Sequence, residues 1–385
     1  MEFFVENINL LLFLPLIVCA ILGFNGLISN RIEKNALFSI SIAAALICLI
    51  FAGAAFDYSV FNNMSVSSNF PWLALDNINF YLGTYLDKIS VSFLLGSGVL
   101  CVLLQVFAFL KLKDIPDFNR MLLYLNLFYF ALNGIFISPN IFQSYLFFEI
   151  IGVAAYLLIN FDFSNRDESK AAIKSFVFNR IGDLTLLFCV LTILYYAVVY
   201  NQLTDANSLS YTNMNNVSAS INSLMSEPLF VFFCSVLMFV IVMKFMQAFI
   251  YLTFEPKENT SLSRVILFQN AMITLAGVYL FMRLNPFFVD LGFDWVWTLL
   301  VLALMFLTLG VLNKLFIPFC KMMGWIEKYV VESVINFAEL LIRAFSYICT
   351  KLQAGNFQSY LIYSLIGLVL IFAFVLIFYV LLIKV

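Results

Sequence analysis

The sequence contains no histidine among its 385 residues. Histidine is the side chain that changes charge near neutral pH, and its ring nitrogens are common ligands of haem and metals. Its absence therefore excludes histidine-ligated haem, a Ser-His-Asp triad and the usual imidazole proton shuttle.

Charged residues are also scarce. They make up 11% of the chain, whereas 64% of the residues are hydrophobic. A soluble domain has about 25% charged and about 45–50% apolar residues. The apolar residues occur in blocks of about 20, long enough to cross a hydrocarbon core of ~30 Å as a helix. Lipid requires that the backbone satisfies its own hydrogen bonds, so the composition predicts an all-α integral membrane protein.

Several motifs are missing as well. The net charge is −2 and no long basic stripe is present, so we expect no nucleic-acid partner. The seven cysteines include no CxxC pair and are interpreted as small core residues rather than as disulfide partners or metal ligands. There is no Gly-rich phosphate loop or nucleotide fingerprint. We therefore expect the chain to bind no cofactor and to carry out no catalytic chemistry in isolation.

About ten transmembrane helices are expected, and the basic residues predict their orientation. Fifteen Lys and Arg residues fall in the connections on one side and three on the other (Lys88, Arg283 and Lys384), while Arg180 and Lys244 lie inside helices, which accounts for all 20. The positive-inside rule places the N-terminus outside. The first block lacks a basic n-region and is predicted to be a retained helix. The predicted spans are 7–28, 36–54, 89–110, 119–137, 139–160, 171–200, 229–253, 263–283, 294–318 and 359–383.

Three segments between the spans have a different character. The outer loop 55–88 contains an alternating stretch at 77–81, which could form a short hairpin. The outer loop 201–228 is rich in Asn and Ser and is expected to be irregular. In 324–353, charged residues recur at steps of four, seven and four, which predicts an amphipathic helix on the membrane surface or on a partner subunit. These residues are Lys328, Glu332, Glu339 and Arg343.

Four ionisable residues stand out well inside predicted spans, and near the middle of the bilayer each costs about 2.5–3.5 kcal/mol on insertion scales. They are Glu149, Arg180, Asp183 and Lys244. The functional interpretation is a buried acid–base relay in which Glu149 pairs with Lys244. The alternative is a static ion pair that joins two helices. Arg180 and Asp183 are three residues apart on one helical face, so they could simply satisfy each other.

The segments around these charges carry a family resemblance. Residues 147–161 resemble the helix W-E-G-V-G-L-C-S-Y-L-L-I-G-F, and 171–183 resemble A-A-x-K-A-F-V-x-N-R-x-G-D. Residues 244–280 keep the length of a K-S-A-Q-L-P…T-A-G-V-Y-L segment, and 352–360 resemble L-Q-T-G-x-x-Q-x-Y. These motifs are typical of the antiporter-like L subunit of respiratory complex I (NADH:quinone oxidoreductase) and of related Mrp-type Na⁺/H⁺ antiporter subunits.

The resemblance implies a proton pathway. Glu149 falls on the family's proton-handling glutamate, Lys244 on its partner lysine, and Asp183 on an aspartate that tunes coupling to a neighbouring subunit. Arg180 lies in the same motif as Asp183. Gln269 stands where the family has a histidine. A second departure is Phe249, which replaces a helix-breaking proline.

The resemblance also implies an organisation and a function. We expect N-terminal helices in 1–118, a proton-antiporter-like domain with one five-helix repeat in 119–290, and a linker helix, the surface helix and a last span in 291–385. The second, inverted repeat of the family is expected to be absent. The implied function is a proton half-channel in a translocating NADH:quinone oxidoreductase. Its partners would be other membrane subunits, which would hold NADH, flavin, Fe–S clusters and quinone.

Two alternatives stay open at this point. One is a cation/proton antiporter or bicarbonate-transport subunit of the Mrp-like branch. The other is a degenerate paralogue that packs in a complex and conducts nothing. The implied location is a bacterial inner membrane or the inner membrane of an organelle.

Overall fold

The described part of the chain is a helical bundle with a two-stranded hairpin. The computed structural model describes residues 8–27, 32–61, 63, 65–75, 78–115, 117–161, 166–199, 209–254 and 261–292, and these belong to one compact unit. The elements in chain order are α2 (Leu10–Leu27), α3 (Lys34–Phe61), β1 (Val66–Leu75), β2 (Ile78–Leu86), α4 (Lys88–Leu112), α5 (Phe118–Ile137), α6 (Ile141–Ile159), α7 (Arg166–Val199), η2 (Tyr211–Asn213), α8 (Met214–Leu224), α9 (Glu227–Phe254) and α10 (Ser261–Val289).

The expectation of a mostly helical membrane protein is confirmed. Within the described residues, seven helices contain a stretch that is long and apolar enough to cross a membrane, and α2 contributes a shorter apolar stretch, Leu10–Gly26. Each of the first eight predicted spans coincides with one of these eight helices. The predicted spans 294–318 and 359–383 and the predicted surface helix 324–353 lie outside the described residues. The divisions at 118 and 290 stay predictions.

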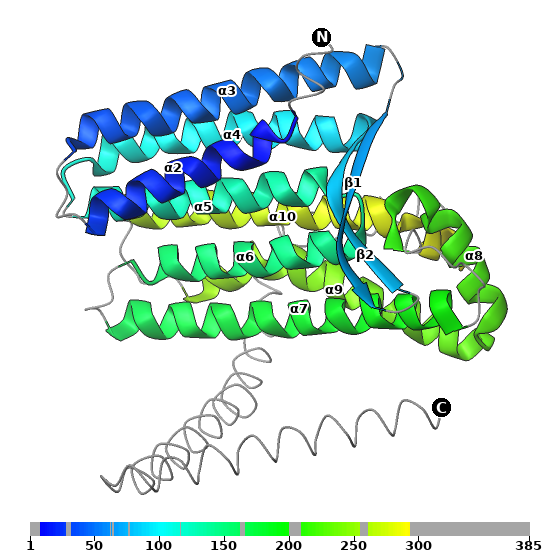
Figure 1. The fold of residues 1–385 in the computed structure, drawn as a ribbon. Coiled ribbons are helices and arrows are strands. Elements are labelled where there is room, and N and C mark those ends of the chain that lie inside the picture. The colour runs from blue at the N-terminus through cyan, green and yellow to red at the C-terminus, as the bar shows by residue number, and fades with distance from the viewer. Residues whose placement is uncertain are drawn as a thin grey trace, which may run out of the picture. The chain divides into compact units, whose positions relative to one another are not determined.

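The helices lie side by side, so the bundle has two ends (Figure 1). We call one the hairpin end, because β1, β2 and α8 cover it together with residues 138–140 and 289–292. At the other, the basic end, the Lys34 ammonium group donates to the carbonyls of Lys113 and Ile115 at 3.2 and 3.1 Å. There Arg120 also donates to the Phe161 carbonyl at 2.7 Å.

Sequence signals start two helices at the hairpin end. The Asp87 carboxylate accepts the Ser90 backbone N–H at 2.8 Å before α4, and the Asn140 side chain accepts the Gln143 N–H at 2.8 Å before α6. Asp and Asn are favoured at this position because their side chains bind N–H groups that the helix leaves unpaired. The second cap fixes the start of α6, the helix that carries Glu149.

The hairpin is longer than the alternating stretch suggested. β1 and β2 pair antiparallel from Val66 opposite Leu86 to Leu75 opposite Ile78, with an irregularity between Pro71 and Leu73. The hairpin is fixed to α6 by reciprocal bonds: the Gly83 N–H donates to Gln143 Oε1 at 2.8 Å, and Gln143 Nε2 donates to the Gly83 carbonyl at 2.9 Å. A Cβ atom at Gly83 would lie 1.8 Å from the Ser68 carbonyl oxygen, so only glycine fits there.

The expectation of an irregular outer loop at 201–228 is wrong for its second half. Residues 214–224 form α8, in which Met214, Val217, Ser218 and Ile221 are buried at helical spacing while Asn215, Asn216, Asn222 and Ser223 are exposed. The Ser218 hydroxyl donates to the Asp290 carboxylate, which ties α8 to the end of α10. The high Asn and Ser content obscured an amphipathic helix with a narrow apolar face.

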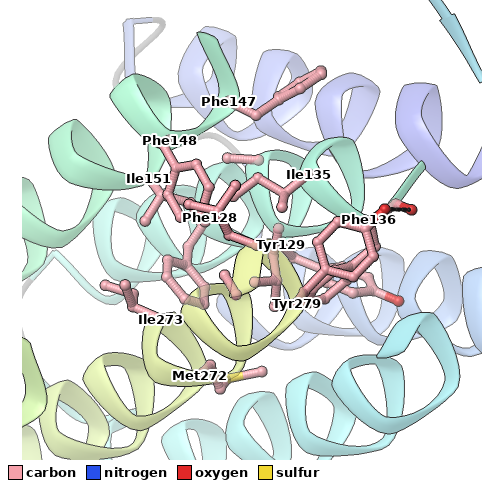
Figure 2. Packing of buried hydrophobic residues seen from close by; sticks show 14 of the residues in the cluster. Phe128, Tyr129, Ile135, Phe136, Phe147, Phe148, Ile151, Met272, Ile273 and Tyr279 are labelled. Atoms are coloured by element: carbon pink, nitrogen blue, oxygen red, sulfur yellow. Dashed lines mark hydrogen bonds between the residues drawn. The ribbon is translucent and has the colours of Figure 1, made fainter. Parts of the chain in front are cut away.

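The centre of the bundle is packed with aromatic side chains from α5, α6 and α10 (Figure 2). Phe136 and Tyr279 meet edge to face with their centroids 5.1 Å apart. The Tyr279 hydroxyl donates to the Phe136 carbonyl at 3.0 Å, and both side chains are fully buried. This core holds α6 and α10 in fixed positions beside the charged residues described next.

Candidate functional site

The structure brings four of the five predicted site residues into one network on three neighbouring helices. Glu149 comes from α6, Arg180 and Asp183 from α7, and Lys244 from α9. Arg180 forms an ion pair with Glu149, and Lys244 forms one with Asp183. Between the two pairs, Arg180 Nη1 lies 3.9 Å from Asp183 Oδ2. The four charges therefore alternate in sign along one line: Glu149, Arg180, Asp183, Lys244.

This pairing differs from the one expected from the sequence. Glu149 and Lys244 do not pair with each other; each has a partner on α7, which lies against both α6 and α9. Asp183 and Asn179 are four residues apart, so both face α9, where Lys244 Nζ donates to Asn179 Oδ1 at 3.0 Å. Arg180 and Asp183 contact each other, as their spacing suggests, but neither is satisfied by the other alone.

Burial changes along the line. The side chains of Glu149 and Arg180 are 26% and 25% exposed, whereas those of Lys244 and Asp183 are 1% and 0% exposed. Each cation lies beside an aromatic ring. The Arg180 guanidinium is 4.5 Å from the Phe176 ring centroid, and Lys244 Nζ is 4.8 Å from the Phe148 ring centroid. The network thus leads from the partly open seam between α6 and α7 into the closed interior of the bundle.

Gly152 permits this close approach of α6 and α7. A Cβ atom at Gly152 would lie 2.3 Å from Asn179 Nδ2 and 3.7 Å from Asp183 Oδ2. Gly152 is three residues after Glu149, on the same side of α6. Because glycine has no side chain, Asn179 and Asp183 have room here to contact Lys244.

Gln269, the fifth predicted site residue, lies apart from these ion pairs. It is on α10 and is completely buried. Among the residues that the structure describes, neither its amide nitrogen nor its amide oxygen has a hydrogen-bond partner. Its place in a pathway therefore depends on what else it binds.

A second charged cluster, at the hairpin end, was missed from the sequence. Arg283 donates to both oxygens of Asp87 at 2.7 Å and to the Ser90 hydroxyl at 2.6 Å. Its guanidinium lies 5.3, 5.2 and 4.9 Å from the ring centroids of Tyr85, Tyr211 and Tyr279. A possible signal was that Asp87 and Arg283 are opposite charges at the outer ends of two predicted spans.

The cluster has a clear electrostatic effect on Asp87. Burial alone would raise the pKa of this carboxyl group, but the hydrogen bonds and the positive charge of Arg283 outweigh burial and hold the pKa below its ordinary value. Asp87 is therefore ionised at neutral pH and fastens the start of α4 to α10. No group of three or more metal-binding side chains occurs in the described residues.

Comparison with known proteins finds a family match over part of the chain. Residues 138–316 match the family model described as the NADH:quinone oxidoreductase/Mrp antiporter transmembrane region. The matched range contains the whole ion-pair network and Gln269. The chloroplast NAD(P)H-quinone oxidoreductase subunit 5 of Chara vulgaris is 30% identical over 281 residues, which are 71% of this chain and 41% of that protein. Over residues 138–316 this chain is similar to the antiporter-like membrane family.

Two further matches are a second curated relative and a solved structure. NADH-ubiquinone oxidoreductase chain 5 of Podospora anserina is 26% identical to this antiporter-like chain over 277 residues, which are 72% of this chain and 40% of that protein. The chain thus spans less than half the length of these curated relatives. Among solved structures, a chain of an archaeal membrane-bound sulfane sulfur reductase is 18% identical, with a TM-score of 0.47 over 62% of this chain and 43% of that one.

Proposed function

We propose that this chain is a membrane subunit of a proton-translocating NADH:quinone oxidoreductase and that Glu149, Arg180, Asp183 and Lys244 form a proton half-channel. The observation that carries the proposal is the unbroken alternation of charge from a partly exposed carboxylate to a buried lysine. Ionisable residues inside a membrane are costly and are characteristic of ion and proton pathways. The relatives named after this oxidoreductase support the choice of this complex.

The geometry suggests how a proton at Glu149 acts on Lys244. A proton that binds Glu149 neutralises the partner of Arg180. The Arg180 guanidinium then turns toward Asp183, whose Oδ2 is already 3.9 Å away. One carboxylate cannot form a full ion pair with two cations at once, so the ion pair between Asp183 and Lys244 weakens. Lys244 then releases its proton. Loss of the proton from Glu149 reverses these steps.

Lysine suits this role better than arginine would. A buried ammonium group can lose its proton, whereas a guanidinium stays charged. Arg180 therefore serves as the movable charge, and Lys244 as the group that gives up a proton. Arg180 needs no proton transfer of its own.

The exposed part of the network supports a partner subunit at α6 and α7. A quarter of the Glu149 side chain is exposed near the middle of a 19-residue helix. The neighbouring outer surface of α7 is apolar, with Ile181, Leu184 and Phe188 exposed. Because exposed charges at this depth are unfavourable in lipid, we infer that another membrane subunit covers the seam with a polar group.

The basic end supports the proposed orientation. Lys34, Lys111, Lys113, Arg120 and Arg166 lie at or near this end, whereas Lys88 and Arg283 lie at the hairpin end. We therefore propose that the basic end faces the cytoplasm, matrix or stroma and that the hairpin faces outside. NADH, flavin, Fe–S clusters and quinone would be bound by other subunits of the complex.

The experiment is proton uptake per electron transferred in sealed membrane vesicles that contain the chain with its native partners. Glu149→Gln keeps the size of the side chain but cannot ionise, so proton uptake should fall sharply while assembly is retained. Glu227→Gln is the matched control, because Glu227 is exposed at the start of α9. Full stoichiometry in Glu149→Gln would show that the chain packs in its complex without carrying the proton.

The same preparation identifies the complex. Copurification with subunits that carry flavin and Fe–S clusters would confirm the oxidoreductase. Copurification with other antiporter subunits alone would favour the Mrp branch, which the family description also includes.

A further inference from the structure

Arg283 lies where several separate segments meet at the hairpin end. Asp87 precedes α4, Tyr85 is at the end of β2, Tyr211 belongs to η2, and Tyr279 is one turn earlier on α10. The guanidinium contacts all four residues, through the two-oxygen ion pair with Asp87 and through its position over the three rings. The Arg283 side chain is only 6% exposed. A charge that is withdrawn from water to this extent in a membrane protein indicates a function.

The segment before α8 closes the hairpin end over this cation. The Tyr211 backbone N–H donates to the Pro139 carbonyl at 3.0 Å, and the Tyr211 hydroxyl donates to Ser144 Oγ at 2.8 Å. The Tyr211 ring is buried against the Arg283 guanidinium. The segment is therefore fastened to α6 and packs directly on the buried charge.

The cluster lies at a different depth from the ion-pair network. Lys244 is 17 residues after Glu227, where α9 begins near the hairpin end, and Arg283 is six residues before Val289, where α10 ends. At 1.5 Å per residue, these positions are ~26 and ~9 Å from the hairpin end. Arg283 thus lies between the depth of Lys244 and the surface that the hairpin covers.

The electrostatics around Arg283 are unfavourable for a proton. Asp87 shares its negative charge between Arg283 and the start of α4, where it accepts the Ser90 backbone N–H at 2.8 Å. Both α4 and α6 begin at this end, and the N-terminus of a helix carries partial positive charge. Arginine itself stays protonated and cannot pass a proton on. Buried arginines and positive helix ends are barriers to protons and cations in membrane channels.

We propose that Arg283 and the residues around it close the hairpin end of the proton half-channel to protons. This inference rests on the proposed function. A half-channel that leads from the seam between α6 and α7 to Lys244 must be closed at its other end, because protons would otherwise cross the bundle without electron transfer. Arg283 is the barrier, and Asp87 and the three tyrosines hold it in position.

Passive proton leak tests the barrier. Sealed vesicles that contain the chain with its native partners are given a pH gradient without substrates, and an entrapped pH-sensitive dye follows its decay. Arg283→Gln keeps hydrogen-bond donors but loses the charge, so the gradient should decay several-fold faster than in the parent. Asp87→Asn/Arg283→Gln leaves no unpaired charge and should leak equally. Arg283→Lys keeps the charge and should leak far less than Arg283→Gln.

Gln143→Leu is the control for a loosened hairpin end. It removes both hydrogen bonds between Gln143 and Gly83 but leaves the charge of Arg283 in place. Its gradient should decay about as slowly as that of the parent. If Gln143→Leu or Arg283→Lys leaked as fast as Arg283→Gln, packing rather than charge would close this end, and the proposal would be overturned.

A double variant identifies the route of the leak. Combining Arg283→Gln with Glu149→Gln removes the proton-binding group at the exposed end of the half-channel and should return the leak to the parent rate. A leak that persists in this variant would overturn the proposal, as would an Arg283→Gln variant that holds the gradient as long as the parent. The proposed function fails separately, through full proton uptake in Glu149→Gln with Arg283 unchanged.

Discussion

Gly152→Ala tests whether the contact between α6 and α7 holds the network together. The added Cβ would lie 2.3 Å from Asn179 Nδ2. An ordinary contact needs about 3.4 Å or more, so Asn179 must move by roughly 1 Å. Overpacking costs about 1–3 kcal/mol, and we expect the lower half because the contact is with the end of a side chain. The ordinary gain of about 0.5–1 kcal/mol for Gly→Ala in a helix offsets part of this cost.

The functional effect should exceed the effect on stability. Asn179 binds Lys244 Nζ at 3.0 Å, and its displacement removes one of the two groups that hold the lysine. We expect the free energy of unfolding in detergent to fall by about 1 kcal/mol and proton uptake per electron to drop well below that of the parent.

Gly96→Ala is the matched control for this variant. Gly96 is also in a helix, but a Cβ atom there would have no neighbour within 4 Å. Its stability should be unchanged or slightly higher, with full proton uptake. Combining Gly152→Ala with Asn179→Ala removes the clash and should recover stability without recovering uptake. If Gly152→Ala were as stable and active as Gly96→Ala, the close approach would have no role in the network.

Three further predictions concern the rest of the bundle. Asp87→Asn leaves Arg283 partly unpaired and should destabilise the chain by roughly 3 kcal/mol in unfolding experiments. Because the folded-state pKa of Asp87 is below the ordinary 3.8, the ion pair should contribute its full stability above pH 3.8 and lose it as the pH falls through the lowered pKa. An acid titration of stability that shows no difference between parent and variant would contradict this. Cysteines introduced at 113 and 216 should be labelled by an impermeant reagent from opposite sides of the membrane; labelling of both from one side would refute the topology. Lys244→Arg keeps the ion pair but cannot readily lose a proton, so it should assemble normally and fail to support proton uptake, whereas retained uptake would assign Lys244 the role of a counter-charge only.

The positions of the helices could be predicted because lipid imposes a simple rule, whereas some ends differ by several residues, as at Phe61 of α3 and Val289 of α10. Blocks of about 20 apolar residues must become helices, and eight of them do so within the described residues. Asp87 and Asn140 also act as helix caps, as their residue types favour. By contrast, α8 has only 11 residues and a narrow apolar face, so its Asn and Ser content was misleading.

The partners of the charged residues could not be predicted in the same way. The sequence shows which residues share a face of one helix, as with Asn179 and Asp183. It does not show how each helix is rotated about its axis or which helix lies beside it. For this reason Glu149 was expected to pair with Lys244, whereas α7 lies between their helices and binds both. The contact between Asp87 and Arg283 joins residues 196 positions apart, beyond any local pattern.

The central claim is that Arg180 transmits the protonation of Glu149 to Lys244. Arg180→Gln tests it most directly, because both proton-binding groups remain and only the charge between them is removed. The measurement is proton uptake per electron transferred in sealed vesicles, with assembly checked by copurification. The account predicts that Arg180→Gln assembles, transfers electrons and loses the share of proton uptake that Glu149→Gln also loses. Full proton stoichiometry in Arg180→Gln would contradict the account, because Glu149 and Lys244 would then communicate without the charge that lies between them.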